Sequence, residues 1–298
     1  MRGRALFFYS VCCLIWGSTW LVIKIGLVDL PPFRFAGFRM AIACAILAPF
    51  AFRSRPCLSG REGRAIALAG FLQIGVSYAC VFAAERTIAS GMTAVLFASF
   101  PIWVSLFAHA LLPDEPMRLS ALAAAMLGIA GVAILELPAV ETLIAGGRFP
   151  VAALLPLAAS ITSAFANVWM KKQLSRVPPE FNLWGQTLVG SIFLFSLSFA
   201  FESGSPMHWS ARAIGALAYL SILGTVIAFL ALFWLIPRVP IATIGAIPLI
   251  DTLIAVSLGA AILGESVGWR LWAGGAMILT GAALAGRTAT TGSRDVPA

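Results

Sequence analysis

The ionisable residues inside apolar stretches are the first candidates for chemistry in this chain. Asp251 is the only charged residue between Arg238 and Glu265, and Arg39 lies about two helical turns beyond Pro32. A charged side chain at the centre of a membrane helix costs about 2.5–3.5 kcal/mol on insertion scales, so such residues are functional candidates. Asp251 can hold a proton, contact a ligand ammonium or accept a structural hydrogen bond. Arg39 can pair with a carboxylate or face a wet cavity. We therefore interpret both as coupling or structural charges.

Large rings and neutral polar side chains near the middle of the apolar stretches form a second group of candidates. Gly17 lies beside Trp16 and would allow another backbone or a ligand to approach closely. Rings with a few polar groups suit a ligand that has an apolar body, although packing between helices or against lipid explains many of them equally well. We predict that six residues from different stretches line one binding cavity: Trp16, Ser18, Tyr78, Trp103, Asn167 and Thr225.

The composition places these residues in a membrane. The 298 residues are 60% hydrophobic and only 11% charged, with a mean hydropathy of +0.97, whereas a soluble domain carries about 25% charged residues. The apolar stretches lack the two-residue alternation of membrane strands, so we predict an all-α polytopic fold. Ten transmembrane helices are expected, at residues 5–27, 32–52, 64–84, 91–112, 118–137, 150–170, 181–200, 211–235, 241–263 and 267–286.

The net charge of +8 reports topology rather than a nucleic-acid partner. The basic residues occur in twos and threes between apolar stretches and form no basic stripe interleaved with exposed aromatics. Lys and Arg are retained on the cytoplasmic side of short loops, and the densest cluster lies between residues 53 and 64. We therefore predict that both termini are cytoplasmic and that the basic start, Met1–Arg4, precedes a retained first span.

Several kinds of chemistry have no support in the residues. The five cysteines are odd in number and form neither a disulfide framework nor a metal-ligand pattern, and no phosphate-binding loop or nucleophile elbow is present. A membrane enzyme acting on lipids would need paired acid and base groups, and His109 and His208 make no persuasive set. We predict no cofactor, no metal and no enzymatic activity.

The chain also repeats itself. Pro31-Pro32 opens the second stretch and Pro178-Pro179 opens the seventh, 147 residues later, while Leu112-Pro-Asp-Glu115 and Leu263-Gly-Glu265 follow the fourth and ninth. Five crossings per copy is an odd number, so the second copy enters the membrane from the opposite face. The prediction is two inverted five-helix repeats, at residues 1–140 and 141–286, followed by a cytoplasmic tail at 287–298. Inverted repeats are typical of secondary transporters.

Pro101 and Pro248 interrupt the fourth and ninth stretches, which are equivalent in the two copies. Proline removes a backbone donor and kinks a helix interior. Interruptions at corresponding positions point to a substrate site or a hinge, and we predict that these prolines mark hinges.

These motifs together resemble the EamA-type transporters of the drug/metabolite transporter superfamily. The resemblance covers about residues 8–285 and rests on Trp16-Gly17-Ser18, on Pro32 with Arg39, and on Leu263-Gly264-Glu265. The family often carries Glu-Pro inside the fourth and ninth spans, where this chain has Phe100-Pro101 and Ile250-Asp251.

The resemblance implies a ten-helix carrier of the bacterial inner membrane that exports small metabolites by alternating access. Within the family the chain is similar to bacterial aromatic amino-acid exporters, which favours aromatic or hydrophobic amino acids as substrates. A multidrug or other metabolite exporter is the alternative, and an integral membrane lipid enzyme is a further one. The expected partners are the substrate and the lipid bilayer, and the expected state is a monomer.

Overall fold

The computed structural model describes residues 3–54, 56–88, 90–115, 119–137, 140–141, 151–263 and 268–291. Within these ranges the regular structure is helical and contains no strand. Eight of the described helices or helix stacks are long and apolar enough to cross a membrane. Each predicted stretch corresponds to one helix or to one stack of consecutive helices, and the polytopic all-α prediction is confirmed.

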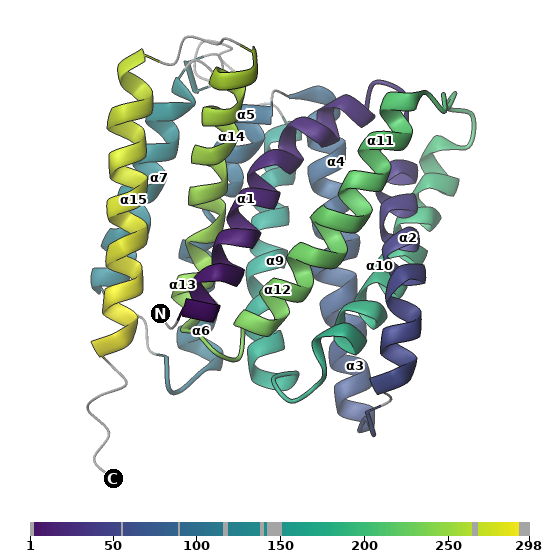
Figure 1. Cartoon of the computed structure of the whole chain (residues 1–298), viewed down its shortest axis with the longest axis horizontal. Helices are drawn as coiled ribbons and strands as arrows, with labels where there is room; N and C mark the ends of the chain where they lie inside the picture. The colour runs from purple at the N-terminus through teal and green to yellow at the C-terminus, as the bar shows by residue number, and fades with distance from the viewer. Residues whose placement is uncertain are drawn as a thin grey trace.

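Some spans are single helices and others are interrupted (Figure 1). The single helices are α1 (Gly3–Gly26), α2 (Pro32–Ser54), α7 (Leu119–Leu135), α10 (Pro179–Glu202) and α15 (Gly268–Thr291). The third span is α3 (Gly60–Ala69), η1 (Gly70–Val76) and α4 (Ser77–Thr87), and the eighth is α11 (Ala211–Ser221), η3 (Ile222–Ile227) and α12 (Ala228–Leu235). The remaining spans are α5 (Ser90–Phe97) with α6 (Phe100–Leu111), η2 (Val151–Ala153) with α9 (Leu154–Gln173), and α13 (Ile241–Gly245) with α14 (Ile247–Leu263).

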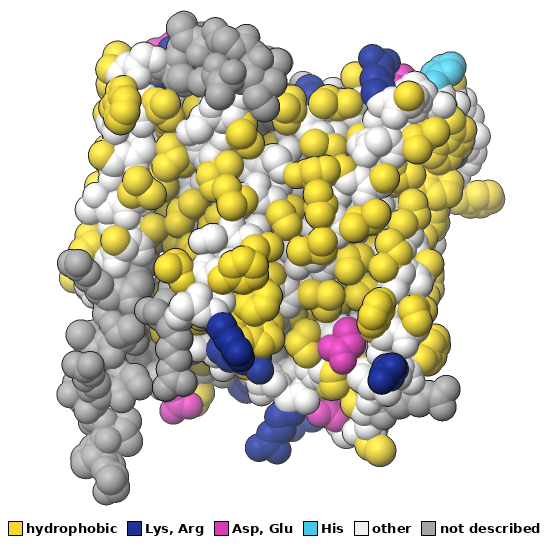
Figure 2. Space-filling view, viewed as in Figure 1, with side chains coloured by type: hydrophobic (Ala, Val, Ile, Leu, Met, Phe, Trp, Pro, Cys, Tyr) yellow, Lys and Arg dark blue, Asp and Glu magenta, His cyan; other side chains and the backbone are white. Residues whose placement is uncertain are grey.

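Most charged side chains lie near the two ends of these helices, and Arg39, Glu85 and Asp251 are buried exceptions. Figure 2 shows an apolar band across the middle of the molecule and charged side chains toward its upper and lower edges. We call the face where α1 begins and α15 ends the terminal side (lower edge in Figure 1). Because successive spans alternate in direction, the basic residues with described side chains, apart from the buried Arg39, divide into two sets. Arg4, Arg53, Arg61, Arg64, Lys171, Lys172, Arg176 and Arg238 lie toward the terminal side, and Lys24, Arg34, Arg86, Arg212 and Arg270 toward the opposite side.

Helix packing follows the inverted repeat. Helix α1 packs on α14 as its equivalent α9 packs on α6, and α1 packs on α11 and α12 as α9 packs on α3 and α4. Helices that are equivalent to each other also pair, α2 with α10 and α7 with α15, and these two pairs lie at opposite ends of the molecule (Figure 1). The helices between them enclose the centre of the bundle.

The helix interruptions also recur in both halves. The fourth span breaks at residues 98–99 and the ninth at Ala246, in each case just before the proline, Pro101 or Pro248. Segments η1 and η3 are π-helical turns at equivalent places in the third and eighth spans. The sequence contained a signal for the proline breaks, since proline ends a helix. It contained none that we recognised for the π-helical turns, which occur frequently at functional sites.

A loop contact ties the two halves together on the opposite side. Asp29, between α1 and α2, accepts hydrogen bonds from Arg212 at 2.6 and 2.8 Å and from Ser210 at the start of α11. The bonds from Arg212 and Ser210 hold the pKa of the Asp29 carboxyl well below its usual range, so the pair is ionised throughout the neutral pH range.

Glycines allow the backbones of α7 and α15 to approach each other directly. A Cβ added to Gly131 would lie 2.7 Å from the carbonyl oxygen of Gly274, and one added to Gly281 would lie 2.6 Å from that of Ala124. Backbone atoms on both sides cannot move aside as a flexible side chain would. Small residues are the usual means by which membrane helices pack closely.

We predict that Gly131→Ala destabilises the protein by about 1–3 kcal/mol, because the added methyl overpacks two backbones. Thermal unfolding of the detergent-purified protein measures the loss. Gly215→Ala is the matched control, since nothing lies within 4 Å of a Cβ at that helical position. Equal melting temperatures for the two variants would contradict the close packing of α7 and α15.

Candidate functional site

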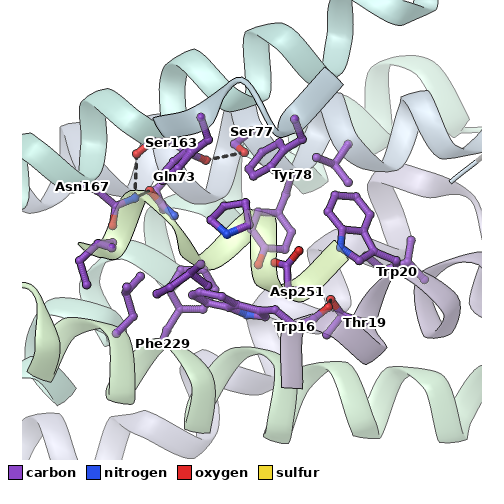
Figure 3. Close-up of a pocket in the computed structure, with 18 of the residues that line it drawn as sticks. Trp16, Thr19, Trp20, Gln73, Ser77, Tyr78, Ser163, Asn167, Phe229 and Asp251 are labelled. Carbon is purple, nitrogen blue, oxygen red and sulfur yellow. Dashed lines mark hydrogen bonds between the residues drawn. The ribbon is translucent and has the colours of Figure 1, made fainter. Parts of the chain in front are cut away.

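A cavity of about 110 Å³ lies at the centre of the bundle, between the two halves (Figure 3). This volume has room for several water molecules and therefore for part of a small metabolite in their place. Its walls come from the first, second, third, fourth, sixth, eighth and ninth spans. The residues that line it are Trp16, Thr19, Trp20, Ile23, Arg39, Gln73, Ser77, Tyr78, Val81, Phe97, Phe100, Ser163, Asn167, Phe229, Leu232, Ile244, Ile247, Pro248 and Asp251.

Arg39 is buried in the wall of this cavity, with only 1% of its surface exposed. Its Nε donates to Thr225 Oγ1 at 2.8 Å, its Nη2 donates to the Tyr78 hydroxyl at 3.3 Å, and its Cζ lies 4.8 Å from the centre of the Tyr78 ring. Neither partner is anionic, and in the described part of the chain Arg39 forms no salt bridge. The guanidinium is therefore fixed in place while its charge is left without a counter-ion.

The π-helical turn η3 holds this arginine. Thr225 donates its own hydroxyl to the carbonyl of Leu220, five residues earlier, and thereby presents the oxygen to Arg39 as an acceptor. Gly224 makes the space, because a Cβ there would lie only 3.0 Å from Arg39 Nη2. The π-helical turn of the eighth span thus positions the buried cation.

Asp251 contributes a carboxyl group to the cavity lining. It lies on α14, one turn beyond Pro248, and is 5% exposed. Its carboxylate lies 3.5 Å from the hydroxyl of Thr252, a long contact, and that hydroxyl donates at 2.8 Å to the carbonyl of Pro248. Within the described ranges Asp251 forms no salt bridge. Figure 3 shows its carboxylate turned toward the middle of the cavity.

Rings make up much of the remaining wall. Trp16 donates through Nε1 to the carbonyl of Gly224 at 3.1 Å and meets the Phe229 ring edge-on, with centroids 5.2 Å apart. Gly17 lets α1 approach α14, since a Cβ there would lie 2.9 Å from the carbonyl oxygen of Asp251. The cavity is thus suited to an apolar group flanked by flat rings.

One wall, between the third and sixth spans, is polar. Asn167 Nδ2 donates to Gln73 Oε1 at 3.1 Å and to the carbonyl of Ser163 at 2.8 Å, and the Ser163 hydroxyl donates to that of Ser77. The buried Asn167 Oδ1 has no hydrogen-bond partner among the described residues. Our prediction omitted Ser163; the signal was its spacing, since Ser163 and Asn167 are four residues apart and lie on one helix face, as do Gln73 and Ser77.

The structure brings together part of the predicted set. Trp16, Tyr78, Asn167, Arg39, Asp251 and Pro248 line the cavity, whereas Ser18, Trp103, Thr225 and Pro101 do not. Ser18 bonds to Tyr219 at 2.5 Å and to the carbonyl of Ile15, and Trp103 donates to Ser99, which bonds to Ser160. These side chains join neighbouring helices, and Thr225 reaches the cavity only through Arg39.

A second buried carboxylate lies beyond the cavity toward the opposite side. Glu85 is one helical turn past the lining residue Val81 on α4 and is fully buried, and neither of its oxygens has a hydrogen-bond partner in the parts of the chain described. Lys24 donates instead to the backbone carbonyl of Glu85 at 2.6 Å. In the sequence, Glu85 could not be distinguished from an interfacial charge, because it lies near the end of an apolar stretch and next to Arg86.

The terminal end of the cavity is sealed. The lining residues nearest that side, Asn167, Phe229, Leu232, Ile244 and Ile247, are each at most 2% exposed. Below them Lys171 forms a salt bridge with Glu115 at 2.6 Å and donates to the carbonyl of Val239, while Glu115 Oε2 accepts from the Ile241 backbone N–H at 2.7 Å. These contacts fasten the ends of α6 and α9 to the start of α13.

The described side chains contain no group of three His, Cys, Asp or Glu that could hold a metal ion. The site is thus a small central cavity that lies between inverted halves and is lined by buried ionisable side chains. Comparison with known proteins establishes the family of the chain. A model of the EamA-like transporter family matches residues 3–137 and again residues 150–287. The chain belongs to the EamA-like transporter family.

Relatives of this EamA-like transporter extend over most of its length. The uncharacterized transporter YoaV of Bacillus subtilis strain 168 is 26% identical, with 90% of this chain and 91% of YoaV covered. The uncharacterized inner membrane transporter YedA of Escherichia coli K12 is 28% identical over 87% of this chain and 83% of YedA. A crystal structure superposes with a TM-score of 0.79 at 19% identity, covering 98% of this chain and 99% of the other, which supports the fold.

We predict that Thr225→Val destabilises the EamA-like transporter by about 1.5–3 kcal/mol, since the change leaves the Nε of a buried guanidinium without its acceptor. Thr225→Ser keeps the hydroxyl and should retain most of the stability. The measurement is thermal unfolding of both purified variants. A valine variant as stable as the serine variant would show that Thr225 does not hold Arg39.

Proposed function

We propose that this EamA-like transporter exports small metabolites, with aromatic or hydrophobic amino acids as the first choice of substrate. The observation that carries the proposal is the central cavity, which combines ring faces from Trp16, Tyr78 and Phe229 with a few fixed polar groups. Such a lining suits a molecule with an apolar body and a polar end, and it disfavours sugars and nucleotides. The transporter family of the chain supports movement of the ligand rather than its chemical conversion.

Alternating access is the proposed mechanism. Buried residues and the Lys171–Glu115 contact close the cavity toward the terminal side, and in the proposed cycle these contacts separate when that side opens. The breaks before Pro101 and Pro248 lie at equivalent places in the two halves, and we propose that they serve as hinges. All the walls come from one chain, so the monomer suffices as the transporting unit.

The proposed location is the bacterial inner membrane, in line with the name of the relative YedA. We place the terminal side in the cytoplasm, because the larger set of basic residues lies there and the positive-inside rule retains such loops. Of the basic residues between 53 and 64, Arg55 lies outside the described residues, as do Arg2, Arg118 and residues 292–298 of the predicted tail.

Cys57 tests this orientation without an engineered probe. It is the exposed cysteine of the chain, in the loop between α2 and α3 on the terminal side, while the other four are buried or half-buried in spans. We predict that a membrane-impermeant maleimide leaves intact cells unlabelled and labels inverted membrane vesicles. Cys57→Ser should abolish the signal. Labelling of Cys57 in intact cells would reverse the topology.

Transport is tested with the purified protein in liposomes, loaded with a panel of labelled amino acids, with and without a proton gradient. We expect efflux of aromatic and large apolar amino acids several-fold above protein-free liposomes. Trp16→Ala should reduce it, whereas Trp272→Ala, at an exposed ring on α15, should not. Efflux of lipophilic dyes but of no amino acid would favour the multidrug alternative. Modification of the lipid would favour an enzyme.

A further inference from the structure

The cavity of this transporter is lined by one buried basic side chain and one buried acidic side chain that do not contact each other. Arg39 and Asp251 both line it, on the second and ninth spans, and no salt bridge joins them. An isolated charge removed from water is strongly unfavourable unless a partner of opposite sign reaches it. Two such charges in one small space form a site that is incomplete without a ligand.

Arg39 has donors to spare for an anion. A guanidinium carries five N–H donors in a fixed fork, and the hydrogen bonds to Thr225 and Tyr78 use one on Nε and one on Nη2. The remaining donors match the two oxygens of a carboxylate. Because both contacts are made to neutral hydroxyls, the positive charge is still available to a ligand.

Asp251 is suited to a cation of the ligand. An ionised carboxylate only accepts hydrogen bonds, and the hydroxyl of Thr252 at 3.5 Å is directed to the carbonyl of Pro248 instead. A ligand ammonium has three donors, and the carboxylate of Asp251 would accept from it. Trp16, Tyr78 and Phe229 line the same cavity and would contact an apolar part of the ligand.

We propose that this cavity selects zwitterions, with Arg39 binding the carboxylate of the substrate and Asp251 binding its ammonium. This inference rests on the proposed export function and names the substrate class of the same site. A molecule with a single charge would leave the other protein charge unpaired in the closed cavity, whereas a zwitterion satisfies both. Discrimination therefore comes from the unpaired group that an incomplete ligand would leave behind.

The test measures exchange of labelled L-phenylalanine in proteoliposomes against unlabelled competitors. The competitors are L-phenylalanine, L-phenylalaninamide, which lacks the carboxylate, and 3-phenylpropionate, which lacks the ammonium. For the unaltered protein we expect the two incomplete analogues to compete at least about tenfold more weakly. Arg39→Gln should weaken phenylalanine and reduce its advantage over the amide, and Asp251→Asn should reduce its advantage over phenylpropionate.

Matched variants separate recognition from folding. Arg34→Gln and Asp29→Asn make the same chemical changes outside the cavity and should leave the order of the competitors unchanged. If a neutral variant does not accumulate, Arg39→Lys and Asp251→Glu keep the charge and should keep the preference for the zwitterion with weaker binding.

The outcomes distinguish this inference from the proposed function. If the unaltered protein exchanges phenylalanine but the amide and phenylpropionate compete as well as phenylalanine does, the zwitterion site is wrong and the amino-acid exporter stands. Unchanged selectivity in Arg39→Gln and Asp251→Asn would also overturn it. If no zwitterion of the amino-acid panel moves, the proposed function itself fails, and the inference fails with it.

Discussion

The burial of Arg39 without a counter-ion is the constraint on which the centre of this protein depends. A guanidinium at this depth needs acceptors from other helices, and a regular eighth span would present only carbonyls already used within the helix. The π-helical turn at residues 222–227 changes this, because Thr225 is held by a carbonyl five residues back and turns its oxygen to Arg39. Gly224 leaves the space that the charge occupies. One local departure from α-helical geometry thus positions the cation beside the Tyr78 ring.

The inverted repeat makes the chemical asymmetry of the site visible. Arg39 and Gln186 are 147 residues apart, at equivalent places in the second and seventh spans. Each lies against the π-helical turn of the other half: a Cβ on Gly70 would meet the backbone of Gln186, as one on Gly224 would meet Arg39. Gln186, however, bonds to Asn182 and Met170 and does not line the cavity. The scaffold has approximate two-fold symmetry. The binding site does not, because Arg39 lines the cavity and its equivalent, Gln186, does not.

The sequence predicted the scaffold better than the cavity, for a physical reason. Apolar stretches and paired prolines are local signals that survive any packing, so the spans and the breaks before Pro101 and Pro248 could be anticipated. Whether a mid-span side chain faces the cavity depends on rotation about its helix axis. Ser18 and Thr225 differ from Trp16 and Tyr78 in that rotation, and a π-helical turn shifts it again for every residue that follows. Ser163 was missed because serine is common between membrane helices. What distinguishes it is its hydrogen bond to Ser77 on the third span, which the sequence does not reveal.

Equivalent lysines lie beyond the two ends of the cavity and make different contacts. Lys24 and Lys171 are 147 residues apart, near the ends of the first and sixth spans, and both donate to backbone carbonyls just before an interrupted helix, at Ile88 and Val239. Lys171 also has the carboxylate of Glu115, whereas among the described residues Lys24 forms no salt bridge. Separating Lys171 from Glu115 also removes the carboxylate from the backbone N–H of Ile241, and both charges must then be hydrated. Opening the terminal side therefore requires Lys171 and Glu115 to reach water together, a requirement that the carbonyl contacts of Lys24 do not impose on the opposite side.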